Sequence, residues 1–379
     1  MKRLLVLLPV LFAFALPTAR AVEAPTITIS KSDRLTIALE GVSGEVAKTL
    51  QNDLTMSGYF KFVPADSAAY VVRAVSTGPS LAGKVADRGG NVVLNTTKNG
   101  TPRQQAHLLA DDIIQTLTGA PGIAGGKIAF VANKTGSKEI YTVDSDGAGL
   151  VQLTRDNSIS VGPHLRPDGR ALVYTGYKSG YADVYQVDLS SGSRSRIIKF
   201  PGTNTGASYS PNGSRLAVTL SKDGNPELYV TSANGGNPRR LTHTRGVESA
   251  PTWSPDGDEI IYVNDDRGTP QLYRIPAIGG TGRLIATGHG YNTEPDWSPD
   301  GKKVAFNVRQ GGAFAVAVLE LATGQTRIVA EGQSPSWGAN SRHLVFAQAG
   351  ALILLDAQSG QRTTLISGLG SVTEPTWSR

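Results

Sequence analysis

The sequence contains no cysteine among its 379 residues. Disulfide bonds are therefore excluded, and an exported protein of this composition has to be stabilised by the burial of apolar side chains. A lipoprotein needs a cysteine at its cleavage site, so a lipid anchor is excluded as well.

Long apolar runs are also scarce, and the one that is present lies at the start of the chain. Residues 4–16 are almost uniformly apolar, and the small residues after them end in Ala19 and Ala21. About 13 apolar residues are too few for a membrane span, which needs about 20, but they suit a signal peptide. We expect residues 1–21 to be a signal peptide cleaved after Ala21, with a buried N-terminal helix as the alternative. We expect no membrane insertion after cleavage.

Charge of one sign is not concentrated anywhere in the chain. The formal charge of +6 falls to +3 because Lys2, Arg3 and Arg20 leave with the signal peptide. A weakly positive chain without a basic block is poor evidence for nucleic-acid binding. We therefore expect no nucleic-acid partner.

Recognisable catalytic and metal-binding motifs are absent. The five histidines, which we expect at the surface or in turns, are His107, His164, His243, His289 and His343. No two of them have a metal-binding spacing, and the chain has no G-x-S-x-G sequence. Residues 144–147 (DSDG) resemble the start of a calcium loop but lack its later acidic ligands, so we interpret them as a turn. We expect no catalysis, no cofactor and no bound metal.

A repeat of about 44 residues dominates the rest of the sequence. The four tryptophans, Trp253, Trp297, Trp337 and Trp377, occupy one position of it at spacings of 44, 40 and 40, and Tyr209 and Leu165 precede them at the same period. Most are followed by an S-P-D-G-type turn. Each repeat contains four short β-rich segments, which is the size of a propeller blade.

The second strand of each repeat gives the number of blades. It recurs at 128–130, 172–174, 216–218, 260–262, 304–306 and 344–346, which predicts six blades. The repeat position held by the tryptophans, here called the ring residue, lies in the innermost strand of each blade. The first blade lacks this inner strand, because Pro121 stands where its ring residue should be. Trp377 has no blade after it, so we expect the C-terminal strand to complete the first blade and close the ring.

Residues 34–120 lack the repeat and predict a small α/β domain. Strands are expected at 35–39 and 69–75, and a hairpin over 81–94. One helix is expected after the N-cap Ser43, and another from Pro102 to Leu117 with Leu108, Leu109, Ile113 and Leu117 on one face. The predicted organisation is a signal peptide (1–21), an N-terminal arm (22–33), the α/β domain (34–120) and a six-bladed β-propeller (121–379).

Three glutamates precede inner strands of the predicted propeller. Glu248, Glu294 and Glu374 are expected in loops that gather at one mouth of the ring. They are either solvated loop carboxylates or a partly acidic binding face with a cation at the channel mouth.

With these features together, the chain resembles the TolB family, the periplasmic propeller proteins of the Tol-Pal system. The resemblance rests on the signal peptide, the small α/β domain, the Leu117-Thr118-Gly119 junction, the entry sequence at 127–131 (KIAFV) and six W-S-P-D-G-type blades. It implies a non-catalytic, monomeric scaffold that acts in outer-membrane integrity and in constriction at cell division.

The resemblance also implies two partners. A Pal-like peptidoglycan-associated lipoprotein would bind the loops that enter the inner strands of adjacent blades, through Thr203, Asn204, Gly206, Glu248, Ser249, Asn292, Thr293 and Glu294. A TolA-like inner-membrane protein would bind the N-terminal arm, through Val22, Glu23, Ile27, Ile29 and Asp33. The alternatives are an exported propeller enzyme, lyase or peptidase-like, and a wall- or sugar-binding module, for which Tyr291 is the one obvious aromatic at the mouth.

Overall fold

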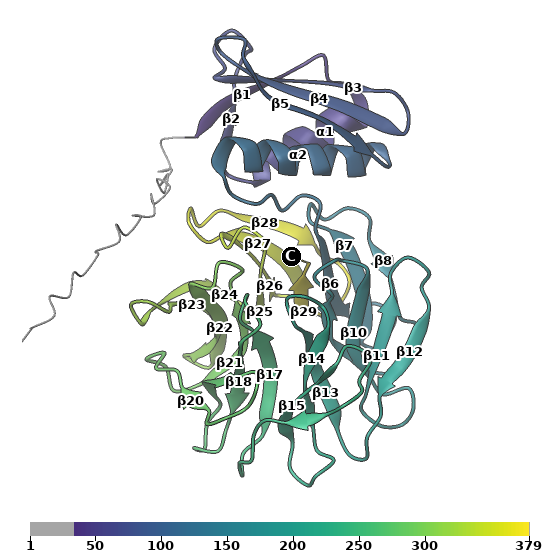
Figure 1. Ribbon diagram of the computed structural model, residues 1–379, viewed down its shortest axis with the longest axis vertical. Coiled ribbons are helices and arrows are strands. Elements are labelled where there is room, and N and C mark those ends of the chain that lie inside the picture. Colours follow the sequence, from purple (N-terminus) through teal and green to yellow (C-terminus); the bar gives the residue numbers. More distant parts are fainter. Residues whose placement is uncertain (1–33, 379) are drawn as a thin grey trace, which may run out of the picture.

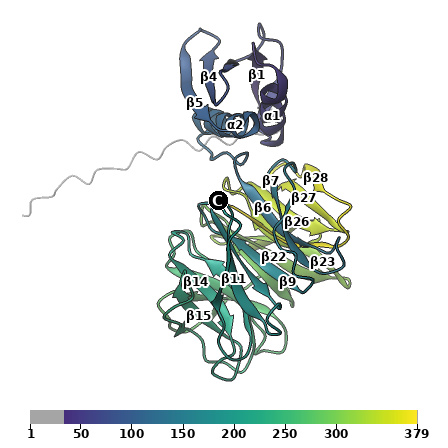
Figure 2. The ribbon, with the colours of Figure 1, turned by 90° about the vertical axis from the view of Figure 1, so that its right-hand side faces the viewer.

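A computed structural model describes residues 34–378, and it consists of a small α/β region and a β-propeller (Figure 1). Helices α1 and α2 lie between the five-stranded sheet and the propeller, and the view in Figure 2 shows the same order of layers. The predicted N-terminal arm and signal peptide lie outside the described residues.

The α/β region is one mixed sheet with both helices on one face. Its elements are β1 (Leu35–Glu40), α1 (Gly44–Met56), β2 (Phe60–Phe62), β3 (Tyr70–Ser76), β4 (Ser80–Asp87), β5 (Val92–Asn99) and α2 (Pro102–Thr118). The sheet order is β2-β1-β3-β4-β5, with β1 parallel to both of its neighbours. The three-residue strand β2 was not predicted, because three residues carry no usable periodicity.

Helix α2 shows how the local sequence fixes both ends of an element. The Thr101 side chain caps the start in a reciprocal capping box with Gln104, and Pro102 occupies the first turn. Gly119 ends the helix at a φ of 73°, as predicted from the Leu-Thr-Gly sequence. The predicted apolar face was wrong at Leu108, which is 41% exposed, because the face that packs against the sheet is centred on Leu109 and Ile113.

The propeller has six four-stranded blades, as predicted. Blade 1 comprises β29 (Val372–Trp377), β6 (Lys127–Ala132), β7 (Glu139–Asp144) and β8 (Val151–Gln152). Blade 2 comprises β9 (Ser160–Leu165), β10 (Ala171–Gly176), β11 (Asp183–Asp188) and β12 (Arg194–Ile198). Blade 3 comprises β13 (Asn204–Tyr209), β14 (Arg215–Leu220), β15 (Glu227–Ser232) and β16 (Arg239–Arg240).

The remaining three blades repeat this order. Blade 4 comprises β17 (Glu248–Trp253), β18 (Glu259–Asn264), β19 (Gln271–Pro276) and β20 (Arg283–Leu284). Blade 5 comprises β21 (Asn292–Trp297), β22 (Lys303–Gln310), β23 (Ala313–Glu320) and β24 (Gln325–Glu331). Blade 6 comprises β25 (Gln333–Trp337), β26 (His343–Gln348), β27 (Ala351–Asp356) and β28 (Arg362–Ile366).

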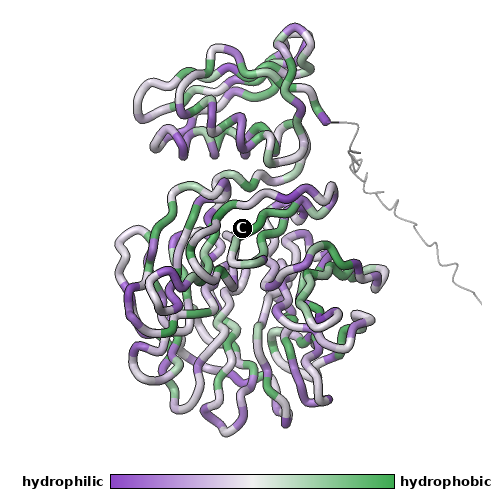
Figure 3. The backbone as a smooth tube through the Cα atoms, turned by 180° about the vertical axis from the view of Figure 1, so that it is seen from behind, coloured by the Kyte–Doolittle hydropathy of each residue, from purple (hydrophilic) through white to green (hydrophobic). Residues whose placement is uncertain are grey.

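The C-terminal strand closes the ring. Strand β29 pairs with β6 through Trp377 and Ile128, which joins the end of the chain to the first blade. Closure removes two free sheet edges that would otherwise be open to aggregation. Figure 3 shows the hydrophobic stretches along the blade strands, and the buried ring residue Trp337 packs between adjacent blades.

The α/β region contacts the propeller through its helices and the turn after α1. Asp111 of α2 accepts hydrogen bonds from the backbone N–H groups of Ala124 and Gly125, at 2.8 Å each. The guanidinium group of Arg342 lies 4.4 Å from the centre of the Tyr59 ring. Met56 packs against the apolar core shared by blades 1 and 6. The division at residue 120 stays a prediction.

Among the described residues, no helix is both long enough and apolar enough to span a bilayer.

Candidate functional site

A cavity of about 550 Å³ lies on the propeller axis, and all six inner strands line it. One end, here called the first mouth, is bordered by Val161, Tyr177, Thr205 and Ser249. The other end is bordered by prolines of the turns that follow the inner strands, such as Pro211 and Pro255. Cavities on a rigid scaffold, reached through loops, are where propellers bind their partners.

Every inner strand has a β-bulge where it faces the channel. One residue in each has a positive φ, and the pairing to the second strand shifts register there. These six channel-lining residues, here called the bulge ring, are Gly162, Gly206, Ala250, Glu294, Ser334 and Glu374. A bulge re-aims side chains and frees backbone groups. The bulge ring therefore determines which side chains and backbone groups face the channel.

The sequence carried a signal for these bulges that the prediction did not use. In five of the six inner strands a proline follows the bulge residue, two positions before the ring residue, as in Pro251 before Trp253. Proline cannot donate to the ladder and is tolerated in strands at bulges. A proline repeated at this position marks the bulge.

The bulge ring places two carboxylates in the channel. Glu294 Oε2 accepts a hydrogen bond from Ser334 Oγ at 2.9 Å and another from the Asn307 amide. Glu374 Oε2 accepts one from the Gly162 N–H at 2.6 Å. Burial raises the pKa of Glu294, and the nearby charge of Glu374 raises it further, while the hydrogen bond from Ser334 opposes the rise.

The described lining of the channel is acidic. It includes a third carboxylate, that of Asp296, which accepts a hydrogen bond from the Trp337 N–H at 2.6 Å. No lysine or arginine occurs among the described residues that line the cavity. The channel therefore favours cationic groups over anionic ones.

His164 is the one histidine in this lining, and its hydrogen bonds fix its tautomer. Nδ1 accepts from the Tyr209 N–H at 3.3 Å, because a backbone N–H can only donate. The proton of the neutral ring is therefore on Nε2, which donates to Ser208 Oγ at 3.1 Å. A serine that accepts from histidine is not activated by it, so this pair does not have the arrangement of a nucleophile and its base.

The structure separates the eight residues predicted to bind a Pal-like partner. Those lining the channel are Gly206, Ser249 and Glu294, those outside it and not buried are Thr203 and Thr293, and those fully buried are Asn204, Glu248 and Asn292. The buried amides hold loops in place: Asn204 Nδ2 donates to the Phe200 carbonyl at 2.8 Å, and Asn292 Nδ2 donates to the His289 carbonyl at 2.9 Å.

The prediction that three glutamates lie in loops was wrong. Glu248 is the first residue of β17, and Glu294 and Glu374 lie within β21 and β29. The inner strands begin earlier than the sequence indicated, because the bulge interrupts the alternation by which a strand is recognised. Glu294 and Glu374 line the channel, whereas the Glu248 side chain is buried between blades.

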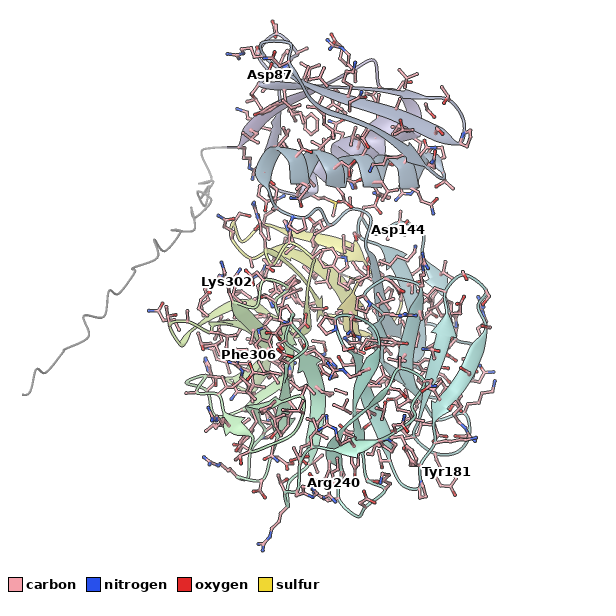
Figure 4. The ribbon with its side chains drawn as sticks, in the orientation of Figure 1. Asp87, Asp144, Tyr181, Arg240, Lys302 and Phe306 are labelled. Atoms are coloured by element: carbon pink, nitrogen blue, oxygen red, sulfur yellow. The ribbon has the colours of Figure 1, made fainter. Side chains whose placement is uncertain are left out.

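Two histidines and the aromatic residues also differ from expectation. His107 and His343 are buried instead of lying at the surface, and burial lowers the pKa of His343 to about 4. Tyr291 is not the one aromatic near this end of the ring. Tyr177 lines the first mouth, and Tyr181, labelled in Figure 4, is 73% exposed.

Among the described residues, one group could offer three ligand atoms to a metal ion: Asp53, His107 and Asp146. Its ligand atoms already have protein partners. His107 Nδ1 lies 2.7 Å from Asp53 Oδ2, and the Arg103 guanidinium donates to Asp146 Oδ2 at 2.7 Å. The guanidinium group supplies the positive charge there, so we interpret this group as a contact between the α/β region and the propeller.

The five residues predicted to bind a TolA-like partner, Val22, Glu23, Ile27, Ile29 and Asp33, lie outside the described residues, as does the predicted cleavage site.

Comparison with known proteins gives one family match and several relatives. The family model of the TolB beta propeller domain matches residues 114–379. Protein TolB homolog of Chlorobium chlorochromatii is 36% identical over 134 residues, which cover 33% of this chain and 30% of that protein. Tol-Pal system protein TolB of Geobacter sulfurreducens is 46% identical over 77 residues, 20% of this chain and 18% of that protein. The chain thus spans less than a third of either curated relative.

A solved structure extends the similarity to nearly the whole chain. TolB from Acinetobacter baumannii matches with a TM-score of 0.81 and 26% identity, covering 91% of this chain and 96% of that one. A chain of the nidogen/laminin complex matches with a TM-score of 0.56 at 14% identity, covering 67% of this chain and 99% of that one, which shows the fold alone.

Proposed function

Because the chain belongs to the TolB β-propeller family, we propose that it is a non-catalytic, periplasmic, protein-binding component of a Tol-Pal system. The observation that carries the proposal is the match to TolB from Acinetobacter baumannii, since it includes the α/β region as well as the propeller. Many proteins share the propeller alone, so the combination of both parts is the more specific feature.

The proposed docking face for a Pal-like peptidoglycan-associated lipoprotein is the first mouth. Ser249, Gly206 and Glu294 line the channel there, and Thr203 is exposed beside it. The acidic lining suits a partner segment that brings a lysine, an arginine or backbone N–H groups into the channel. Asn204, Glu248 and Asn292 support this face by holding its loops and strands from within.

The proposed site for a TolA-like inner-membrane protein is the arm, residues 22–33. Its Thr-Ile alternation suits pairing with the edge of a partner's sheet. A partner on the arm and another on the first mouth would make the protein a two-ended scaffold that supports outer-membrane integrity and constriction at cell division.

The channel chemistry supports a binding role over catalysis. The His164 ring donates to Ser208, so the serine is not activated as a nucleophile. The carboxylates of Glu294 and Glu374 join neighbouring inner strands through hydrogen bonds from Ser334 Oγ and the Gly162 N–H, which gives them a structural role.

A pull-down from solubilised envelopes tests the proposal. Residues 22–379 are compared with Ser249→Arg, which places a bulky cation in the first mouth, and with Ala322→Arg, which adds the same group to an exposed turn between β23 and β24. We expect the Pal-like lipoprotein with the wild type and Ala322→Arg, and at least tenfold less with Ser249→Arg.

A shortened chain, residues 34–379, tests the second partner in the same experiment. It should retain the Pal-like lipoprotein and lose the TolA-like protein. Failure of the wild type to recover any lipoprotein would overturn the proposal, as would equal losses with the two arginine variants.

A further inference from the structure

Equivalent side chains meet at the junctions between successive blades. The residue that begins an inner strand donates its N–H to the carbonyl just before the third strand of the preceding blade: Asn204 to Ala182, Glu248 to Pro226, and Asn292 to Pro270. These backbone bonds bring the first residue of each third strand next to the first residue of the following inner strand.

At two of these junctions, an amide donates to an acceptor. Asn292 Nδ2 donates to Gln271 Oε1 at 2.6 Å, and Asn204 Nδ2 lies 3.4 Å from Asp183 Oδ1. At the junction of blades 3 and 4, the same positions hold Glu227 and Glu248. Two carboxyl groups thus meet where the other junctions pair a donor with an acceptor.

Both glutamates are completely buried, with 0% exposure. One oxygen of each is satisfied: Glu227 Oε1 accepts from Arg240 at 2.7 Å, and Glu248 Oε1 accepts from Thr244 Oγ1 at 2.7 Å and from Asn264. The other oxygen of each, Oε2, is buried without a hydrogen-bond partner among the described residues. A buried unpaired carboxylate oxygen is costly, so the pair lacks one donor.

A proton supplies that donor better than a metal ion would. Two free oxygen atoms fall far short of the six to eight oxygen ligands that calcium takes. Arg240, labelled in Figure 4, balances one negative charge on Glu227 and leaves the second carboxylate without a cation. Two neighbouring carboxylates in a buried site cannot both stay charged.

The surrounding groups reinforce this charge imbalance. The pKa of Glu248 is raised to about 7, mainly by burial and in part by the charge of Glu227, while hydrogen bonds from Thr244 and Asn264 oppose the rise. Burial, together with the charge of Glu248, also raises the pKa of Tyr262 on β18, which therefore stays neutral. Near Arg240, Asp223 accepts from Tyr229 Oη at 2.6 Å, and Lys222 Nζ lies 2.7 Å from the same carboxylate oxygen and balances its charge.

We propose that the Glu248 carboxyl group keeps a proton and donates it in a hydrogen bond to Glu227, and that loss of this proton near neutral pH loosens the junction between blades 3 and 4 beside the channel. The Glu248 carbonyl accepts from Thr219 Oγ1 at 3.0 Å, and the next two residues, Ser249 and Ala250, line the channel. A backbone movement at Glu248 therefore also displaces residues that line the first mouth. The inference concerns the propeller itself and does not depend on the proposed partners.

Glu248→Gln tests the proposal, because the glutamine amide can donate to Glu227 as Asn292 donates to Gln271. In the wild type, the folded state retains a proton that the unfolded state releases, so stability falls as the pH rises from about 4.5 to about 7. A pKa raised from 4.5 to about 7 corresponds to a change of about two orders of magnitude in the unfolding equilibrium constant. We expect Glu248→Gln to remove this fall and to be at least tenfold more stable than the wild type at pH 8.

Urea unfolding of residues 22–379 between pH 5 and pH 8.5 gives the measurement. Glu139→Gln is the matched control, because Glu139 begins the third strand of blade 1 and the following inner strand begins with Ser160 instead of a second carboxyl group. It should change stability by the same factor at every pH. The proposal would be overturned if the free energy of unfolding changed with pH in the same way in the wild type and in Glu248→Gln.

An infrared pH titration of the wild type tests the proposal without any variant, so it does not require that Glu248→Gln folds. A buried protonated carboxyl band that disappears between pH 6 and pH 8.5 supports the proposal. Its absence throughout that range contradicts the proposal, as does a stabilisation by calcium or magnesium that the wild type shows and Glu248→Gln lacks.

Discussion

At the residue scale, the bulge ring differs from position to position in backbone strain. Gly162 and Gly206 reach positive φ without a steric penalty, whereas the other four residues hold φ between 47° and 56° with a Cβ atom. Residues held in the left-handed region cost about 1 kcal/mol or more each and concentrate at binding sites. The strain is therefore stored in the channel wall.

Ala250→Gly should relieve this strain. We expect the free energy of unfolding to rise by about 1 kcal/mol, because glycine accepts the φ of 47° that alanine resists. Urea unfolding at pH 7 measures the change. The control, Ala351→Gly in the regular strand β27, should lose about 0.5–1 kcal/mol. An equal loss in both variants would contradict the assignment of strain to the bulge.

At the element scale, the sequence predicted the six second strands and the closure of the ring, because both follow from a repeat with a fixed period. The repeated proline marks the bulges, but the prediction did not use it. The strand β2 and the burial of His107 could not be predicted in this way, because they depend on very short pairing and on contacts between elements that are distant in the sequence. For the same reason, Glu248 was predicted at a mouth although tertiary packing buries it.

Ring closure depends on Trp377. Its indole N–H donates to Ser145 Oγ at 3.0 Å, and its ring packs in the core that joins blades 1 and 6. We expect Trp377→Ala to lower the free energy of unfolding by about 3–5 kcal/mol and to promote aggregation through the exposed edge of β6. Trp377→Phe, which keeps most of the apolar volume, should lose less than half as much. Thermal unfolding with light scattering checks both, and an unchanged midpoint for Trp377→Ala would refute the closure argument.

At the scale of the whole molecule, charged contacts join the α/β region to the propeller. Arg103 pairs with Asp146, and Arg342 pairs with Asp356 while lying over Tyr59. Burial would lower the pKa of His107, but its hydrogen bond to Asp53 and the charge of Asp53 outweigh burial, so the pKa is raised. Burial also raises the pKa of Asp53, to about 6, so the ion pair is complete only where Asp53 is ionised, and its contribution to stability is lost as the pH rises through the raised pKa of His107.

Breaking both contacts should uncouple the two parts. We expect Asp146→Ala combined with Arg342→Ala to split a single calorimetric transition into two, because each part retains its own apolar core. Arg73→Ala removes an exposed ion pair with Glu40, far from the interface, and should leave one transition. A single transition in the double variant would show that these contacts do not hold the parts together.

The central claim is that the first mouth of the propeller binds a Pal-like lipoprotein. Isothermal titration calorimetry of residues 22–379 with the lipid-free lipoprotein domain tests it most directly. The account predicts a 1:1 complex, at least tenfold weaker with Ser249→Arg and unchanged with Ala322→Arg. No binding by the wild type, or full affinity with Ser249→Arg, would contradict it.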